Sequence, residues 1–356
     1  MKKLVLLGGG YGNMRVLLRL LPNSFPADTE IILVDRSPFH SLKTEFYALA
    51  AGTSTDKEVR VAFPEHPRLK KVYGEVTRID REEKCVYLED GQAIQYDDLV
   101  VALGCEDKYH GVPGAAEHTY SIQSIARSRV TFEKLCGLAP GSTVAIIGAG
   151  LSGIELASEL RESRSDLKIK LFDRSNRILR DFPEKLSEYI KSWFEKNNVE
   201  VIPESNITRV EEGKLYNHDQ VTEADAIVWT AGVQPVKIVR EMEAEKDKFG
   251  RPIINGNYHL PDDEHIFVIG DCASSPLPPT AQLAEEQAER VAKVLKMRWE
   301  GKPVPAELSP IKMKGFMGSL GKKQGFVHLA DTTVTGRIAR LMKSGLLWYY
   351  KRQNDN

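Results

Sequence analysis

The sequence is poor in cysteine and lacks a long apolar run. Its 4 cysteines, Cys85, Cys105, Cys136 and Cys272, form no C-x-x-C pair and no spacing with histidines that suits zinc. This scarcity excludes a disulfide framework and a zinc site, and it favours a reducing compartment. No run approaches the 18 or so apolar residues of a membrane span. Glycines interrupt the apolar run near the N-terminus, so we expect a first strand there rather than a signal peptide.

The sequence also lacks an excess of charge of either sign. With 49 Lys and Arg against 50 Asp and Glu, the formal net charge is −1. No overall electrostatic field therefore attracts nucleic acid, and we expect no nucleic-acid partner and no metal. The 356 residues suit two or three domains, and the 42% hydrophobic content is ordinary for a globular enzyme. These features are typical of a globular chain with ample hydrophobic cores.

The clearest feature that is present is the stretch VAIIGAGLSGIELASEL. Val144–Ile147 suits a buried strand, and Gly148, Gly150 and Gly153 follow at the G-x-G-x-x-G spacing of a dinucleotide-binding turn. The helix after such a turn offers free N–H groups to a pyrophosphate. A second strand ends in Asp173, about 20 residues on, where a carboxylate accepts hydrogen bonds from the ribose of NAD. The alternative is a tight strand-to-helix turn without a ligand.

A second unit of this kind begins at the N-terminus. Lys3–Leu7 reads as a strand, Gly8 and Gly10 keep the spacing, and a later strand ends in Asp35. Asn13 stands where the third glycine is expected, which weakens the match because its side chain must fit where the helix packs on the strand. The alternative is a buried parallel strand unit that binds nothing.

Two such units imply two bound dinucleotides. Both acids argue against a 2′-phosphate on the ribose, but Arg36 and Arg174 follow them directly, and a nearby arginine accommodates that phosphate. The choice between NADH and NADPH therefore stays open at this point.

The remaining pattern predicts an α/β fold with two Rossmann-like domains and a short C-terminal region of hairpin and helix. Helices are expected over His40–Gly52, Asp181–Asn198 and Gln282–Trp299. Strands or hairpins are expected over Val72–Leu88, Asp98–Gly104, Glu200–Val210, Ala226–Gly232, Asp263–Ala273 and Lys312–Leu329. A lone His40 or Cys105 is more often structural than catalytic.

The tail, Thr335–Arg352, combines basic residues with an aliphatic and aromatic face. A helix of this composition can lie in a membrane interface, and it can equally pack on its own domain or on a second copy of the chain. The sequence leaves these alternatives open.

The order of landmarks resembles the two-dinucleotide-binding flavoproteins, and among them the type II NADH dehydrogenases. The landmarks are GGGYGN, ALG, GAGLSGIELASEL, WTAG, and FVIGDCA followed by PPTAQLAEEQ, and they cover nearly the whole chain. The resemblance implies an FAD-binding domain in two parts, 1–115 and 256–302, an inserted NADH-binding domain, 116–255, and a C-terminal interface or membrane-associating region, 303–356.

The resemblance also assigns residues to each site. For FAD it implies Gly8, Gly10, Tyr11, Gly12, Asn13, Asp35, Arg36, Val76, Ala102, Leu103, Gly104, Gly270, Asp271, Ala281 and Gln282. For NADH it implies Gly148, Gly150, Leu151, Ser152, Gly153, Glu155, Asp173, Ala231 and Gly232. Glu155, Gln282 and Gln287 are the expected catalytic residues, with both glutamines at the quinone end.

The implied reaction has two halves: NADH passes a hydride to the flavin N5, and two electrons then pass to a quinone without proton pumping, as in a respiratory chain. Two acids precede Gln287 and would repel an apolar quinone, and the tail is short for a membrane anchor. Two alternatives follow, a soluble NADH:acceptor reductase and an NADH-sensing protein without catalysis. If the acceptor is a quinone, we expect a cytoplasmic protein that contacts the inner face of the cell membrane peripherally through its tail.

Overall fold

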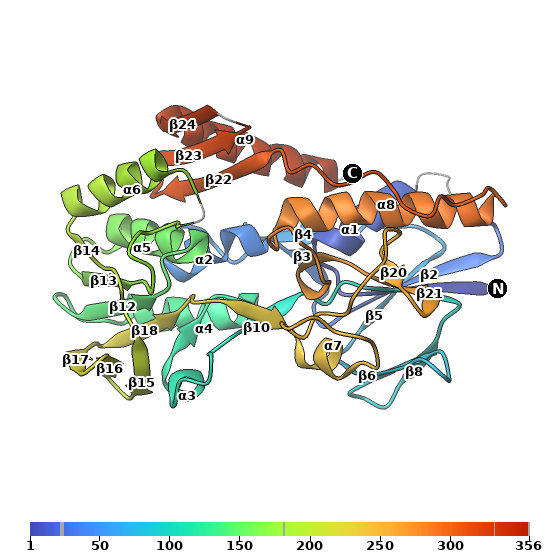
Figure 1. Cartoon of the computed structure of the whole chain (residues 1–356), viewed down its shortest axis with the longest axis horizontal. Helices are drawn as coiled ribbons and strands as arrows, with labels where there is room; N and C mark the ends of the chain where they lie inside the picture. The colour runs from blue at the N-terminus through green and yellow to red at the C-terminus, as the bar shows by residue number, and fades with distance from the viewer. Residues whose placement is uncertain (22–24, 181, 331, 355–356) are drawn as a thin grey trace.

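The computed structural model describes residues 1–21, 25–180, 182–330 and 332–354. Two α/β units lie at opposite ends of the long axis, and the C-terminal segment runs along one side of both (Figure 1). Each unit is built on a parallel sheet whose central strands are buried on both faces, as their runs of β-branched and aliphatic residues require.

The first unit contains a six-stranded sheet in which only β20 is antiparallel to its neighbour, β21. Its strand order is β20 (His259–Leu260), β21 (Asp263–Val268), β9 (Asp98–Val101), β1 (Lys2–Leu7), β2 (Thr29–Asp35) and β5 (Leu69–Tyr73). Helices α1 (Tyr11–Leu20) and α8 (Ala281–Trp299) pack against each other and bury one apolar cluster with this sheet. The N-cap of α8 is Thr280, whose hydroxyl accepts the Leu283 N–H at 3.0 Å.

The second unit contains a five-stranded, all-parallel sheet. Its order is β11 (Tyr120–Ser121), β18 (Ala226–Trp229), β12 (Thr143–Ile147), β13 (Lys168–Phe172) and β14 (Val199–Ile202). The helices of this unit are α3 (Ala115–His118), α4 (Ile125–Cys136), α5 (Leu151–Ser163) and α6 (Glu184–Lys196).

Shorter elements join and flank the two units. Strands β10 (Cys105–Asp107) and β19 (Val233–Pro235) pair antiparallel where the chain passes between them. The flanking elements are β3 (Phe39–Ser41), β4 (Arg60–Ala62), η1 (Lys43–Glu45), α2 (Phe46–Ala50), β6 (Val76–Asp80), β7 (Cys85–Leu88), β8 (Ala93–Gln95), β15 (Ile207–Glu211), β16 (Lys214–Asn217), β17 (Gln220–Glu223), α7 (Lys237–Glu241) and η2 (Gly270–Cys272).

The C-terminal segment is a three-stranded antiparallel sheet followed by a long helix. Its elements are β22 (Gly315–Leu320), β23 (Gln324–Leu329), β24 (Thr332–Gly336) and α9 (Arg337–Asn354). The expected hairpin is confirmed. Strand β22 packs on α5, and α9 packs on the sheet that precedes it, so this segment covers the junction of the two units (Figure 1).

Two sequence predictions are wrong in part. His40–Gly52 is not one helix: His40 lies in β3, which pairs with β4, and only Phe46–Ala50 is α-helical. Glu200–Val210 is not one strand, because Pro203 has no N–H to donate and Glu204 takes a positive φ of 53°, which separates β14 from β15.

Candidate functional site

Each unit carries a glycine turn between the central strand of its sheet and the next helix. Gly8 has φ +89°, and a Cβ there would lie 2.5 Å from Ala102 O; Gly148 has φ +103°, and a Cβ there would lie 2.8 Å from Ala231 Cα. Only glycine fits either position. A Cβ built on Gly10 or Gly150 meets nothing within 4 Å, and neither helix has a side-chain cap. The first amides of both helices therefore face open space, which fits a pyrophosphate.

An acid ends the second strand of each unit and is tied to the turn. Asp35 accepts the Gly9 N–H at 2.6 Å, and Asp173 accepts the Ala149 N–H at 2.7 Å. The other oxygen of each carboxylate accepts the N–H two residues further along the chain, at 2.7 Å in both units. These bonds hold both carboxylates beside the place where an adenosine ribose meets the turn.

A cluster of three side chains joins the ends of separate elements of the first unit. Lys43 Nζ lies 2.9 Å from Cys105 Sγ and 3.3 Å from Asp271 Oδ2, and the Cys105 thiol donates to Asp271 Oδ2 at 3.1 Å. Burial raises the pKa of the Cys105 thiol to about 12, although the Lys43 charge opposes the shift. The thiol is therefore protonated at neutral pH, which is the opposite of an activated redox cysteine.

The C-terminal helix inserts a lysine beside the helix that follows the second turn. Lys343 and Glu155 are each only 7% exposed, and Lys343 Nζ lies 2.5 Å from Glu155 Oε1. Lys343 also donates to Tyr47 Oη at 2.7 Å, and the Ser319 N–H donates to Glu155 Oε1 at 2.9 Å. Glu45 Oε1 is 3.6 Å from the same ammonium. This network joins both units and the C-terminal sheet.

Burial dominates the electrostatics of the pair. It raises the pKa of Glu155, and the nearby Lys343 charge opposes that rise. Burial by itself lowers the pKa of Lys343, but the charges of Glu155, Tyr47 and Glu45 outweigh it and the net pKa is raised. Lys343 thus stays protonated, and the Glu155 carboxylate binds a proton more tightly than an exposed glutamate does.

An aromatic cluster lies beside the first turn. His40 Nδ1 is 2.8 Å from Gly9 O, which can only accept, so the Nδ1–H tautomer donates and Nε2 accepts from the Tyr350 hydroxyl at 3.0 Å. The ring of Tyr11 lies 4.8 Å from that of His40 and 5.3 Å from that of Tyr350. Burial lowers the pKa of His40 to about 4, so the imidazole is neutral at pH 7.

The two predicted glutamines lie in different surroundings. With its nitrogen facing the carbonyl, Gln282 donates to Gly315 O at 3.2 Å and accepts from the Lys314 N–H at 3.1 Å. Gln287 is only 1% exposed, and its Oε1 accepts the Gly270 N–H at 2.6 Å. Gln287 is therefore not a solvated residue of the helix surface; it holds the loop that carries Asp271.

The two acids before Gln287 are both paired. Glu285 lies 2.5 Å from Arg15 of α1, and Glu286 lies 3.0 Å from Arg290, one turn along α8. Their charges are thus compensated locally, which weakens the argument that they would repel an apolar ligand.

Most predicted site residues follow strands of the two parallel sheets or begin the next helices. The first unit brings together its turn with Asp35, Ala102, Leu103, Gly104, Gly270, Asp271 and Ala281. The second brings together its turn with Asp173, Ala231 and Gly232. Arg36 is exposed after β2, and Val76 lies apart, as the first residue of β6.

Sequence reasoning missed Lys43, Tyr47, Lys343 and Tyr350. For Lys343 a signal was present, since it lies four residues after Ala339 and seven before Tyr350, on the face of the tail helix that packs inward.

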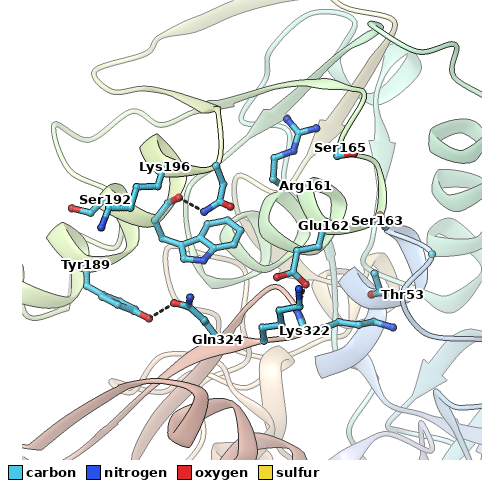
Figure 2. A pocket seen from close by; sticks show the side chains of 14 residues that line it. Thr53, Arg161, Glu162, Ser163, Ser165, Tyr189, Ser192, Lys196, Lys322 and Gln324 are labelled. Atoms are coloured by element: carbon cyan, nitrogen blue, oxygen red, sulfur yellow. Dashed lines mark hydrogen bonds between the residues drawn. The ribbon is translucent and has the colours of Figure 1, made fainter.

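A cleft of about 790 Å³ lies between the end of α5, helix α6 and the turn between β22 and β23. Figure 2 shows Tyr189 directed toward Gln324, with its hydroxyl donating to Gln324 Oε1 at 2.9 Å, and Glu162 close to Lys322. None of the predicted site residues lines this cleft.

The family model described as pyridine nucleotide-disulphide oxidoreductase matches residues 2–288. The chain is 59% identical to the NADH dehydrogenase-like protein YutJ of Bacillus subtilis (strain 168) over 99% of this chain and 100% of that protein. It is 30% identical to a type II NADH:quinone oxidoreductase of Staphylococcus aureus (strain MSSA476), over 96% of this chain and 93% of that protein.

A solved structure shares the fold over nearly the whole length. The structure of NDH2 from Plasmodium falciparum in complex with NADH superposes with a TM-score of 0.84 at 14% sequence identity, over 99% of this chain and 96% of that chain. The arrangement of two parallel-sheet units with a C-terminal segment is thus one that known proteins adopt.

Proposed function

The chain belongs to the pyridine nucleotide-disulphide oxidoreductase family, and we propose that it carries electrons from NADH through FAD to a quinone without pumping protons. Family membership makes it an NADH-dependent oxidoreductase with FAD and NAD(H) as cofactors. The acceptor, the residues at each site and the place of the reaction are what the proposal adds.

We assign FAD to the unit of residues 1–115 and 256–302, and NADH to residues 116–255. When bound, FAD supplies the ability to take a hydride from NADH and to release two electrons to an acceptor. The open amides at the start of α1 and α5 would hold the two pyrophosphates. Asp35 and Asp173 would each accept a ribose hydroxyl, and Lys43 with Asp271 would flank the FAD chain beyond its pyrophosphate.

The observation that carries the quinone proposal is the buried Lys343–Glu155 pair. Reduction of a quinone to a quinol takes two electrons and two protons, and NADH supplies both electrons but only one proton. Glu155, Lys343 and Tyr47 form a connected set of groups that can hold a proton at the junction of the two units. A disulfide acceptor is disfavoured, because all four cysteines are free and the Cys105 thiol is held protonated.

We also propose that α9 makes the contact with the membrane that would supply the quinone. Its outer face exposes Ile338, Leu341, Met342, Leu346, Trp348 and Tyr349, while Ala339 and Lys343 face inward. Arg337 and Arg352 lie at the two ends of this face, and such a helix binds in the plane of an anionic membrane surface. In the described part of the chain, no helix is long and apolar enough to span a bilayer.

The test of the acceptor compares two electron acceptors in the same preparation. Ferricyanide takes electrons without protons, whereas a short-chain quinone needs both. We expect Lys343→Met and Glu155→Gln to lower NADH:quinone turnover by about 100-fold and to leave NADH:ferricyanide turnover within a few-fold of wild type. Lys351→Met removes a charge from the same helix outside the network and serves as the control.

Equal losses with both acceptors would contradict a specific role of the pair in proton delivery. Turnover with ferricyanide but none with quinone in the unaltered protein would instead favour a soluble acceptor. A dimeric mass in light scattering, abolished by Leu341→Glu, would assign the outer face of α9 to a second copy of the chain rather than to a membrane.

A further inference from the structure

A cleft of about 630 Å³ opens beside Asp173, at the ribose end of the second turn. One wall is the loop after β13, which contributes Arg174, Ser175 and Arg180. The facing wall is the loop after β14, which contributes Glu204 and Ser205. None of these residues belongs to the pyrophosphate turn itself, so the cleft extends the nucleotide site on the side of the adenosine.

Backbone hydrogen bonds fix the two walls to each other and to the acid. The Ser205 N–H donates to Asp173 O at 2.8 Å, and the Glu204 N–H donates to Ser175 O at 3.0 Å. The Asp173 carboxylate accepts the Ala149 N–H from the turn and the Ser175 N–H from the wall. These hydrogen bonds therefore fix the position of the cleft relative to Asp173, where the ribose is expected.

The lining offers donors and positive charge. Arg174, Asn176 and Arg180 are exposed in the cleft, and the Ser175 hydroxyl lies between the two arginines along the chain. Glu204 is the one acid among its lining residues. Guanidinium groups, with hydroxyl and amide donors, are the usual recognition set for a phosphate monoester.

The first unit provides an internal comparison. Its acid is also followed by an arginine, Arg36, but the position six residues beyond is Leu42, whereas the position six residues beyond Arg174 is Arg180. FAD carries no phosphate on its adenosine ribose. Counted along the chain from the acid, the second arginine is present in the unit assigned to the nicotinamide dinucleotide and absent from the other.

We infer that this cleft takes the 2′-phosphate of NADPH, so that the enzyme accepts NADPH as well as NADH. The inference rests on the proposed function, since it concerns the dinucleotide that the second unit oxidises. NADPH differs from NADH only by that phosphate, and an arginine near the ribose-binding acid accommodates it. Asp173 still accepts the ribose hydroxyl of NADH and opposes a phosphate, which is why both dinucleotides are used rather than NADPH alone.

The first experiment measures reduction of the bound flavin by each dinucleotide in the holoenzyme under anaerobic conditions. We expect both NADH and NADPH to bleach the flavin band. Arg174→Ala should lower the second-order rate with NADPH by about tenfold, the low end for one hydrogen bond to a charged group, and change the rate with NADH less than twofold. Asp173→Asn should shift the ratio of rates toward NADPH. Arg209→Ala, on the neighbouring strand β15 and outside the cleft, is the matched control.

A second experiment needs no turnover. Calorimetric titration of the holoenzyme with adenosine 2′,5′-bisphosphate and with 5′-AMP isolates the 2′-phosphate, and inorganic phosphate alone tests whether any anion suffices. We expect the bisphosphate to bind about tenfold tighter than 5′-AMP and to lose that advantage in Arg174→Ala.

The outcomes separate the inference from the function beneath it. Bleaching by NADH but not by NADPH, or an equal loss with both dinucleotides in Arg174→Ala, overturns the inference and leaves the function intact. If neither dinucleotide bleaches the flavin, the proposed function fails, and the titration still decides whether the cleft recognises a 2′-phosphate. Equal affinity for the bisphosphate and 5′-AMP overturns the inference that the cleft recognises a 2′-phosphate.

Discussion

In the first unit the third residue of the glycine motif is Asn13, and in the second it is Gly153. Asn13 is fully buried, and its Nδ2 donates to Leu7 O and Gly8 O, both at 2.9 Å. In the second unit the corresponding carbonyls are Ile147 O and Gly148 O. They accept the hydroxyl of Thr230, at 2.8 and 2.9 Å.

The donor has therefore changed sides between the two units. In the first unit the side-chain donor comes from the helix, and Ala102 follows the neighbouring strand β9; in the second the donor is Thr230, which follows the neighbouring strand β18, and the helix contributes glycine. The backbone N–H of Ala102 or Thr230 bonds the first of the two carbonyls in both units. The same two buried carbonyls are satisfied by opposite partners. The departure at Asn13 therefore does not leave the first turn without a side-chain donor: Asn13 supplies there what Thr230 supplies in the second unit.

A third carbonyl differs in its sensitivity to pH. Gly9 O accepts from the imidazole of His40, whereas the matching Ala149 O accepts from the Leu179 N–H at 3.3 Å. A backbone amide does not titrate in the physiological range, but an imidazole does. Acid is thus expected to act on the first turn and to spare the second.

The largest loss of stability should come from replacing Gly153 of the second turn with asparagine, the residue that the first turn has at Asn13. In Gly153→Asn the Cβ would overlap Gly148 O of the backbone, which cannot move aside, and we expect a destabilisation above about 4 kcal/mol. Adding Thr230→Ala removes a second close contact, since the Cβ would also lie 2.8 Å from Thr230 Oγ1, but it should not rescue the variant because the overlap with Gly148 O remains. Thermal melting and NADH binding are the measurements; a Gly153→Asn protein that melts like wild type would refute the account of this turn.

Acid should have the next largest effect, through His40. Its pKa falls from 6.5 to about 4 in the folded chain, so between these values the unfolded chain binds the extra proton and stability decreases as pH is lowered. The shift corresponds to about 3 kcal/mol. We expect denaturant midpoints to fall and FAD to be released across this window. His40→Asn keeps a donor to Gly9 O without titrating, and a midpoint that fell as steeply in this variant would contradict the assignment.

A smaller loss of stability is expected from removing the side-chain donor of the first turn, and a second substitution should partly restore it. Asn13→Gly leaves two buried carbonyls without their side-chain donor, at about 1 kcal/mol for each bond, and should lower FAD retention after dialysis. The double variant with Ala102→Thr supplies a hydroxyl from the strand, as Thr230 does, and should recover part of the loss. Ala102→Thr that worsened the Asn13→Gly protein would show that the two turns are not interchangeable in this way.

The local units were predictable and the long-range contacts were not. Strand, glycine turn, helix and acid are specified within some 30 residues each, because the glycine positions and buried strands leave a periodic signal. The Lys343–Glu155 pair joins residues 188 apart, and no local pattern encodes it. His40 was mistaken for part of a helix because its strand is defined only by pairing with Arg60–Ala62.

The site shows the same division. Asp35, Asp173 and the glycines can be proposed as ligand contacts from the sequence because a pyrophosphate and a ribose demand such residues at fixed spacing. The cluster of Lys43, Cys105 and Asp271 draws on three separate segments, and the burial that keeps the Cys105 thiol protonated is a property of their packing rather than of any one segment.

The most direct test of the division of labour between the two units is an anaerobic stopped-flow trace of the purified protein, mixed first with NADH and then with a short-chain quinone. The account predicts a flavin absorbance band in the protein as purified, which bleaches with NADH and returns with quinone. A protein without a flavin band, or one whose band NADH leaves unchanged, would contradict the assignment of FAD to the first turn and NADH to the second.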